Sequence, residues 1–145
     1  MTIELCVIEG DGIGEEVVPA AERVLKTILP DLTIKRAHAG WGAFQTFGTS
    51  LPDATIQLAR KTGAVLFGAA SSPSHPVTGY YSPIVRLRRM LKTHANIRPI
   101  SYLPVPTARA GVNLIVVREN TEDIYVSEEE ATDDVRTEKK IITRD

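Results

Sequence analysis

Hydrophobic positions along the first part of the chain switch repeatedly between the period of a strand and the period of a helix. Residues 3–8 alternate and cluster β-forming side chains, and after a glycine-rich turn residues 15–29 place apolar side chains at helical spacing. The pattern then predicts a strand within 32–40, a helix over 51–63 and a buried strand over 64–70. Strands that alternate with helices of this length predict an α/β fold with a parallel sheet.

The next stretch changes from a loop to a helix and then to extended chain. Residues 71–83 are rich in serine, proline and glycine, and long loops at strand ends of α/β proteins frequently bind ligands. Ser82 followed by Pro83 is a helix start signal, with serine as the N-cap and proline at the first helical position. The helical stripe that should face the core consists of Ile84, Leu87, Met90 and Leu91.

After Pro99 the hydrophobic periodicity weakens. Residues 100–111 contain two prolines and little pattern, whereas residues 112–120 form a strong apolar strand that ends in charge. The block from Ser127 onward is acidic at first and then of mixed charge, and we expect a solvated hairpin, helix or arm there.

Composition narrows the class of protein. The chain has 145 residues, 43% of them hydrophobic, and its 17 basic and 18 acidic residues nearly cancel, which is typical of a soluble globular protein and unlike a basic nucleic-acid binder. The only cysteine, Cys6, excludes an intramolecular disulfide and a cysteine-rich metal site. The chain start lacks the basic region of a signal peptide, and no segment approaches the roughly 18 apolar residues of a membrane span. We therefore expect a cytoplasmic protein.

The glycine-rich turn after the first strand, EGDGIGEE, invites comparison with a dinucleotide-binding loop. Its glycines, which begin at Gly10, do not have the spacing G-x-G-x-x-G, and the turn lacks the lysine of a P-loop. Four acids between Glu9 and Glu16 surround the start of the following helix, where a pyrophosphate would need amides and positive potential. We interpret the segment as a tight turn and not as a Rossmann site.

Cations are concentrated in the helix that begins near Ser82. At about 100° per residue, Arg88 lies at the edge of the predicted apolar stripe, so that its guanidinium should be half-buried. Lys92, Arg89 and Arg86, in that order, fall progressively further round the helix from the stripe, where we expect them to be solvated or at a subunit contact.

Two further arginines, Arg98 in extended chain and Arg118 at the end of the apolar strand, complete a set with Arg88. A half-buried guanidinium needs an anionic or carbonyl partner. Because each guanidinium is always charged and matches carboxylate geometry bidentately, three of them suit a ligand with two or three carboxylates. The alternative is that they are solvated or pair with the protein's own acids.

Five segments together resemble the metal-dependent β-decarboxylating dehydrogenases, the family of isocitrate, 3-isopropylmalate, homoisocitrate and tartrate dehydrogenases: EGDGIGEEVVPAA, AGWGAF, LFGAASSP, SPIVRLRRMLKTHANIRP and VVRENTEDIY. AGWGAF with SPIVRLRR is most similar to homoisocitrate dehydrogenases, which serve lysine synthesis by the aminoadipate route. The resemblance implies an isopropylmalate/isocitrate-dehydrogenase-like α/β fold, distinct from Rossmann and incomplete in this chain. Residues 1–99 would be the N-terminal part of the large domain, and 100–145 would begin a smaller dimerisation domain with an arm.

The resemblance also implies roles for particular residues. The substrate-carboxylate arginines would be Arg88, Arg98 and Arg118, and the catalytic tyrosine, which delivers a proton to carbon, would be Tyr125.

Three residues at the start of the helix would complete the pocket. Ser82 would contact the distal group of the substrate, and Ile84 and Val85 would line the wall beside the substrate tail or nicotinamide. Some relatives carry an arginine at the position of Val85, whereas here the charge is on the neighbouring Arg86. The choice among homoisocitrate, isocitrate and 3-isopropylmalate therefore stays open.

The implied reaction is NAD(P)-linked oxidation of a 2-hydroxy-3-carboxy acid followed by loss of CO2, with Mg2+ or Mn2+. In relatives the active-site lysine, the metal-binding aspartates and the adenosine loop come later in the chain or from a dimer partner. We therefore expect the metal ligands outside these 145 residues, and no activity from them alone. Expected partners are a hydroxy di- or tricarboxylate and further copies of the chain, but neither nucleic acid nor a membrane. The rival hypotheses are a non-catalytic subunit that senses a tricarboxylate and a structural oligomerisation fragment.

Overall fold

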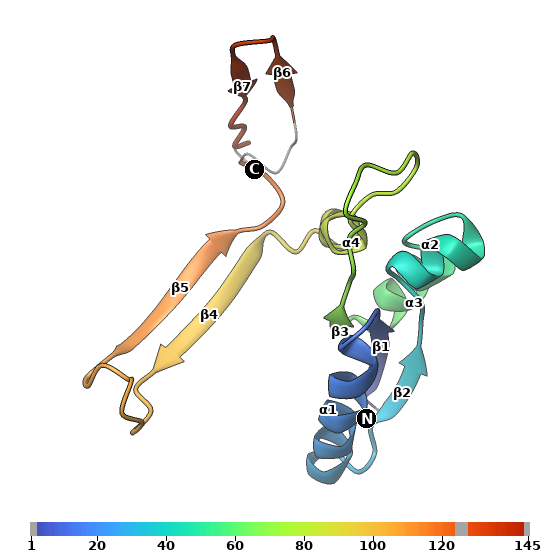
Figure 1. Ribbon diagram of the computed structural model, residues 1–145. Helices are drawn as coiled ribbons and strands as arrows, with labels where there is room; N and C mark the ends of the chain where they lie inside the picture. The colour runs from blue at the N-terminus through green and yellow to red at the C-terminus, as the bar shows by residue number, and fades with distance from the viewer. Residues whose placement is uncertain (1–2, 124–127, 144–145) are drawn as a thin grey trace. The chain divides into compact units, whose positions relative to one another are not determined.

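The computed structural model describes residues 3–123 and 128–143. The chain forms two compact units, Met1–Leu91 and Lys92–Asp145, and each is described by itself (Figure 1). The domain boundary expected between residues 99 and 100 stays a prediction.

The first unit is an α/β structure. Its elements in chain order are β1 (Glu4–Gly10), α1 (Gly14–Ile28), β2 (Thr33–Arg36), α2 (Trp41–Phe47), α3 (Asp53–Thr62), β3 (Val65–Ala69) and α4 (Pro83–Leu91). β1 lies in the middle of a three-stranded sheet and pairs in parallel with β2 and β3. The alternation of strands and helices read from the sequence is therefore confirmed. Gly63 ends α3 in the left-handed conformation, with φ 67°, and its N–H donates to Ala59 O.

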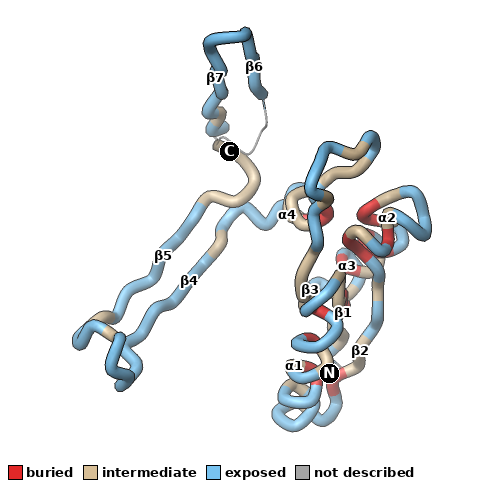
Figure 2. Tube along the Cα trace, viewed as in Figure 1, coloured by how far each residue is buried: buried red, intermediate tan, exposed pale blue. Residues whose placement is uncertain are grey.

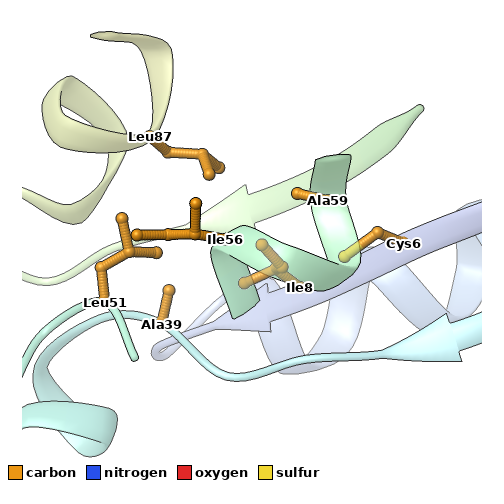
Figure 3. Packing of buried hydrophobic residues seen from close by; sticks show 7 residues of the cluster. All are labelled: Cys6, Ile8, Ala39, Leu51, Ile56, Ala59 and Leu87. Atoms are coloured by element: carbon orange, nitrogen blue, oxygen red, sulfur yellow. The ribbon is translucent and has the colours of Figure 1, made fainter. Parts of the chain in front are cut away.

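The core of this unit lies between β1 and the helices α3 and α4. Cys6 and Ile8 of β1 are fully buried, and the residue between them, Val7, is only 1% exposed and faces the other side of the sheet. A strand with buried side chains on both faces is typical of a parallel sheet that is covered on both sides. The strand predicted to be buried, over 64–70, is β3, and its residues are only half-buried. Figure 3 shows how the core cluster is completed by Ala39, Leu51, Ile56, Ala59 and Leu87.

The helix α1 has the expected bounds, but its apolar stripe is only partly buried. Val18 is buried on the side of α1 that contacts the sheet, whereas Val17, Val24 and Ile28 are 49%, 58% and 68% exposed. The helical period predicts a stripe of Val17, Ala21, Val24, Leu25 and Ile28, but the buried residues of α1 are Gly14, Val18 and Glu22. The period identified the helix and could not show which of its sides contacts the sheet.

The short helix α2 lies in a stretch for which the pattern predicts no helix. It begins after Gly40 and ends at Gly48, whose φ is 72°. Its first two N–H groups, of Trp41 and Gly42, donate to the carboxylate of Asp11, thirty residues earlier in the sequence. A cap that comes from so far along the chain leaves no local sequence signal.

The helix α4 begins at Pro83, as predicted, but a different side of it faces the core. The buried residues are Pro83 and Leu87, Ile84 is half-buried, and Met90 is 36% exposed. The expectation that Met90 belongs to the buried stripe is therefore wrong. The reason is that the first turn of the helix, with Pro83, packs inward and rotates the stripe toward that side.

The second unit consists of two hairpins. β4 (Ala95–Ser101) pairs antiparallel with β5 (Asn113–Glu119), and β6 (Glu129–Ala131) pairs antiparallel with β7 (Arg136–Glu138). The apolar strand is confirmed, and of the three alternatives expected after Ser127, a hairpin, a helix or an arm, the structure shows the hairpin. β4 continues past Pro99 to Ser101, where the sequence shows little pattern.

The strands of this unit are exposed along almost their whole length (Figure 2). Apolar side chains remain open on both faces of the β4–β5 ribbon: Ile97 at 63% and Val117 at 66% on one face, and Leu114 at 46% and Val116 at 42% on the other. Of the helices that the structure describes in either unit, none combines the length and the apolar character needed to cross a membrane.

Candidate functional site

The β4–β5 ribbon places two of the three predicted substrate arginines on one face. In the antiparallel register Arg118 lies opposite Asn96, and Arg98 lies opposite Val116. Since side chains alternate between the faces of a strand, Asn96, Arg98 and Arg118 point to the same side. Diagonal neighbours of this kind are about 7–8 Å apart, close enough for one polycarboxylate to contact both guanidinium groups.

The third predicted arginine, Arg88, lies in α4 of the first unit, close in sequence to the predicted residues Ser82, Ile84 and Val85. Ile84, Val85 and Arg88 are half-buried, and Ser82 is exposed immediately before α4, where its carbonyl accepts the N–H of Arg86. Going round the helix, Ile84, Arg88, Val85 and Ser82 follow one another at steps of about 40–60°. The four predicted residues therefore form one strip on the side away from Pro83 and Leu87.

Arg86 does not lie where the sequence suggested. Its guanidinium carbon lies 4.7 Å from the centre of the Tyr81 ring, and its Nη1 donates to the Tyr81 hydroxyl. That hydroxyl also shares a hydrogen bond of 2.7 Å with Thr49 Oγ1. The expectation that Arg86 is solvated or at a subunit contact is therefore wrong. With Pro83 and Leu87 as the core side of α4, Arg86 flanks the core opposite Arg88 and holds the end of the 71–82 loop.

The start of the same loop is held by Asp11, a residue for which sequence reasoning found no such role. Besides the two N–H groups of α2, its carboxylate accepts the N–H of Ser71 at 2.8 Å. Asp11 therefore joins the turn after β1, the start of α2 and the segment after β3. The sequence signal that could have indicated this role is an acidic residue inside a glycine-rich turn. A favourable interaction with the helix dipole does not by itself require an acid at that position.

Tyr80 closes this loop against an aromatic cluster. Its hydroxyl donates to Ser71 O at 2.6 Å, and its ring packs edge-on against Trp41 and Phe44, with centroids 5.3 and 5.4 Å away. Desolvation by burial and the nearby charge of Asp11 both raise the pKa of Tyr80. The tyrosine hydroxyl stays protonated and remains a hydrogen-bond donor.

The glycines of the first turn serve close backbone packing. A Cβ on Gly10 would lie 1.7 Å from Ala69 O, and one on Gly14 would lie 2.0 Å from Glu9 O. The end of β1, the start of α1 and the end of β3 can therefore approach only because side chains are missing there. Glu15 and Glu16 occupy the first turn of α1. These residues do not fit a bound pyrophosphate, which agrees with the interpretation as a tight turn.

A second polar cluster lies at the carboxyl ends of β1 and β2. Arg36 pairs with Glu9 at 2.5 Å and with Glu22 at 2.9 Å, beside a cavity of about 390 Å3 that Glu9, Arg36 and His38 help to line. None of the predicted site residues lines this cavity. Both partners of Arg36 are carboxylates of the protein itself, so the charge of this arginine is compensated within the fold.

The turn that follows Arg118 is fixed by Glu119. Its Oε1 accepts the backbone N–H groups of Thr121 at 2.6 Å and Glu122 at 2.8 Å, and the Thr121 hydroxyl at 3.0 Å. The backbone N–H of Glu122, followed by that of Thr121, lowers the pKa of Glu119 from 4.5 to about 2. Asn120 Nδ2 donates to Thr93 O at 3.2 Å and ties the end of β5 to the segment before β4.

Two parts of the expected site do not come from the described residues. Tyr125 lies outside them. Within 3–123 and 128–143, no three His, Cys, Asp or Glu side chains are grouped so that they could hold a metal ion. The residues present therefore do not fit the Mg2+ or Mn2+ that the resemblance implies.

Comparisons with known proteins agree with the sequence motifs. Residues 4–144 match the family model described as isocitrate/isopropylmalate dehydrogenase. The chain is 46% identical over 144 residues to the isocitrate/homoisocitrate dehydrogenase of Thermus thermophilus, which covers 99% of this chain and 43% of that protein. It is 42% identical over 144 residues to the 3-isopropylmalate dehydrogenase of Methanothermobacter thermautotrophicus, covering 99% of this chain and 42% of that one.

A solved structure shows the same fold. The crystal structure of isocitrate dehydrogenase from Methylococcus capsulatus matches with a TM-score of 0.84 at 35% identity, over 97% of this chain and 42% of that chain. This chain thus spans less than half the length of the relatives that it matches.

Proposed function

Since this chain belongs to the isocitrate/isopropylmalate dehydrogenase family, we propose that its protein catalyses the NAD(P)-dependent oxidative decarboxylation of a 2-hydroxy-3-carboxy acid. The observation that supports this most is the shared face of Arg98 and Arg118 on the β4–β5 ribbon. Each guanidinium is always charged and matches a carboxylate bidentately, so two of them on one face of a strand pair suit a ligand with several carboxylates.

The residues of this chain bind and orient the substrate. Arg98 and Arg118 would dock its carboxylates and hold the hydroxyl carbon in place, and Arg88 of the first unit is proposed as a further carboxylate-binding residue. A bound nicotinamide would supply the hydride acceptor, and the hydroxyl proton would go to a base. The bond to the β-carboxylate then breaks, CO2 leaves, and Tyr125 delivers a proton to the carbon that carried it. Because the described residues hold no metal-binding cluster, no part of the metal's chemistry is assigned to them.

Homoisocitrate is the proposed substrate, in lysine synthesis by the aminoadipate route. Two observations support it: the segments AGWGAF and SPIVRLRR, and the 46% identity to a relative named for both isocitrate and homoisocitrate. The 42% identity to a 3-isopropylmalate dehydrogenase makes that acid, isocitrate and tartrate the alternatives.

The test is a substrate comparison on the intact gene product. We expect kcat/KM for homoisocitrate, measured by reduction of NAD or NADP with Mg2+ or Mn2+, to exceed that for isocitrate, 3-isopropylmalate and tartrate. Equal values for all four would contradict the substrate assignment. Binding of citrate without turnover of any of them would favour the non-catalytic tricarboxylate-binding subunit instead.

We also propose that the protein acts as a homo-oligomer in the cytoplasm. The exposed apolar faces of the β4–β5 ribbon support a subunit contact, and the single buried thiol of Cys6 suits a reducing compartment. Sedimentation of the intact protein as a monomer at micromolar concentration would contradict the first statement.

A further inference from the structure

We propose that Asn96 is a positioning residue that orients Arg98 for the substrate without neutralising it. Resting on the function proposed above, this inference adds a residue of the carboxylate site for which neither the sequence motifs nor the comparisons give a role. Asn96 precedes Arg98 by two residues in β4 and lies directly opposite Arg118 in β5. Asn96 and Val116 are therefore the two residues that neighbour both arginines on their common face, and Asn96 is the polar one.

The hydrogen bond that carries the inference joins the two β4 residues. Arg98 Nε donates to Asn96 Oδ1 at 3.0 Å. A guanidinium held at Nε keeps both of its Nη groups for a ligand, because a carboxylate can then be bound end-on by the two outer nitrogens. Asn96 is also the only half-buried residue of β4, whose other residues are all exposed. Its side-chain amide is therefore partly shielded from solvent.

The chemical identity of the partner decides what the arginine can do. Elsewhere in the chain Arg36 forms ion pairs with Glu9 and Glu22, which compensate its charge. In contrast, Arg98 forms no ion pair with any acid in the part of the chain that the structure describes. An amide oxygen fixes the orientation of the fork and leaves its full charge for a bound carboxylate.

A carboxylate at position 96 would have the opposite effect. It would pair with Arg98, lie opposite Arg118, and compete with the carboxylates of the substrate on the same face. Only a neutral acceptor of this size can both hold Nε and keep the face cationic. The structure therefore assigns Asn96 to substrate affinity more than to the stability of the ribbon.

The experiment uses the intact gene product with three variants. Asn96→Asp places a competing charge beside Arg98, and Asn96→Ala removes the acceptor without adding charge. Asn113→Asp is the matched control: it adds the same carboxylate to the same ribbon, but position 113 alternates with Arg118 and so belongs to the opposite face. Steady-state KM and kcat, the thermal midpoint and calorimetric binding of citrate are measured for each.

We expect KM to rise about 30-fold or more in Asn96→Asp and about 5- to 10-fold in Asn96→Ala, with kcat changed much less and citrate affinity falling in the same order. Asn113→Asp should change KM less than about twofold. A purely structural role would lower the thermal midpoint of both Asn96 variants and would not make the aspartate worse than the alanine.

The outcomes separate the two proposals. Wild-type turnover or citrate binding with unchanged KM and affinity in both Asn96 variants overturns the role of Asn96 and leaves the proposed function intact. Wild-type protein that neither turns over a hydroxy acid nor binds citrate overturns both. Equal effects of Asn96→Asp and Asn113→Asp would mean that charge on the ribbon, and not the position beside Arg98, is what matters.

Discussion

Single side chains join segments that are far apart in this sequence, and Asp11 does so most clearly. Its carboxylate accepts N–H groups from Trp41, Gly42 and Ser71, and thereby connects three segments of the first unit. Without this carboxylate, each of the three N–H groups would lack its hydrogen-bond acceptor beside the aromatic cluster. The loop that leads to the helix strip begins at this anchor.

Replacement of Asp11 should therefore destabilise the first unit. We expect Asp11→Ala to lower the free energy of unfolding by about 2 kcal/mol, because hydrogen bonds from amides to a carboxylate are lost together. Asp11→Asn, which keeps one acceptor oxygen, should cost less. Urea unfolding followed by the fluorescence of Trp41, the only tryptophan, reports on the site directly.

Asp31 provides the control for that measurement. It is an exposed acid in the turn before β2, and Asp31→Ala should change the free energy of unfolding by less than about 0.5 kcal/mol. Similar losses in Asp11→Ala and Asp31→Ala would show that the three hydrogen bonds contribute little.

Arginine positions show how far residue-level reasoning reaches. Periodicity placed Arg88 at the edge of the buried side of its helix, and the side chain is indeed half-buried. Arg86 was misplaced, because its position depends on Tyr81 and Thr49, and the contact between them comes from the way the loop packs. The position of a residue around a helix follows from the local sequence, whereas the side chain that it contacts beside the core does not.

At the scale of elements, the turn after β5 depends on the ionised form of one carboxylate. The pKa of Glu119 is lowered to about 2 by backbone N–H groups. A lowered pKa in the folded chain means that the stabilisation is fully present above the ordinary value of 4.5 and is lost as the pH falls toward about 2. The turn between Arg118 and Asp123 should therefore loosen in that range.

NMR can check this directly. We expect the carboxyl carbon of Glu119 to titrate well below pH 4.5, and the amide signals of Thr121 and Glu122 to move with the Glu119 titration. In Glu119→Gln the two amides should lose this pH dependence. A pKa near 4.5 for Glu119 would contradict the hydrogen-bonded geometry.

Element existence was easier to predict than element pairing. The sequence pattern located β1, α1, α3, β3, α4 and β5, because each has a period that its own residues display. It missed α2, which is capped by a distant carboxylate, and it did not show that β4 pairs with β5 in the register that makes Arg98 and Arg118 diagonal neighbours on one face. Register follows from contacts between strands, so no single strand contains it.

For the molecule as a whole, the distribution of exposed apolar surface is the main feature. The outer edge of α1 and both faces of the β4–β5 ribbon are open in these 145 residues. A two-stranded ribbon is marginally stable by itself in water, and large apolar patches are usually covered by another segment or subunit. The relatives that this chain matches are more than twice as long.

We therefore expect the 145-residue chain alone to show no turnover of homoisocitrate with NAD or NADP and Mg2+ or Mn2+. The described residues include the arginines proposed to bind the substrate, but no cluster among them could hold the metal. The absorbance of the reduced nicotinamide is the measurement, and the intact gene product under the same conditions is the control. Turnover by the isolated chain would refute the expectation and would require ligands for the metal within it.

The sequence by itself determined the class of fold, the family and the arginines that can recognise a polycarboxylate, because strand and helix periods and spaced motifs are local properties of the chain. Only the tertiary structure decided that Arg98 and Arg118 share one face with Asn96 beside both, that Arg86 is held on Tyr81, and that Asp11 joins three segments. These facts depend on strand register and on contacts between residues far apart in the sequence. Such contacts form only when the chain packs, so no local pattern records them.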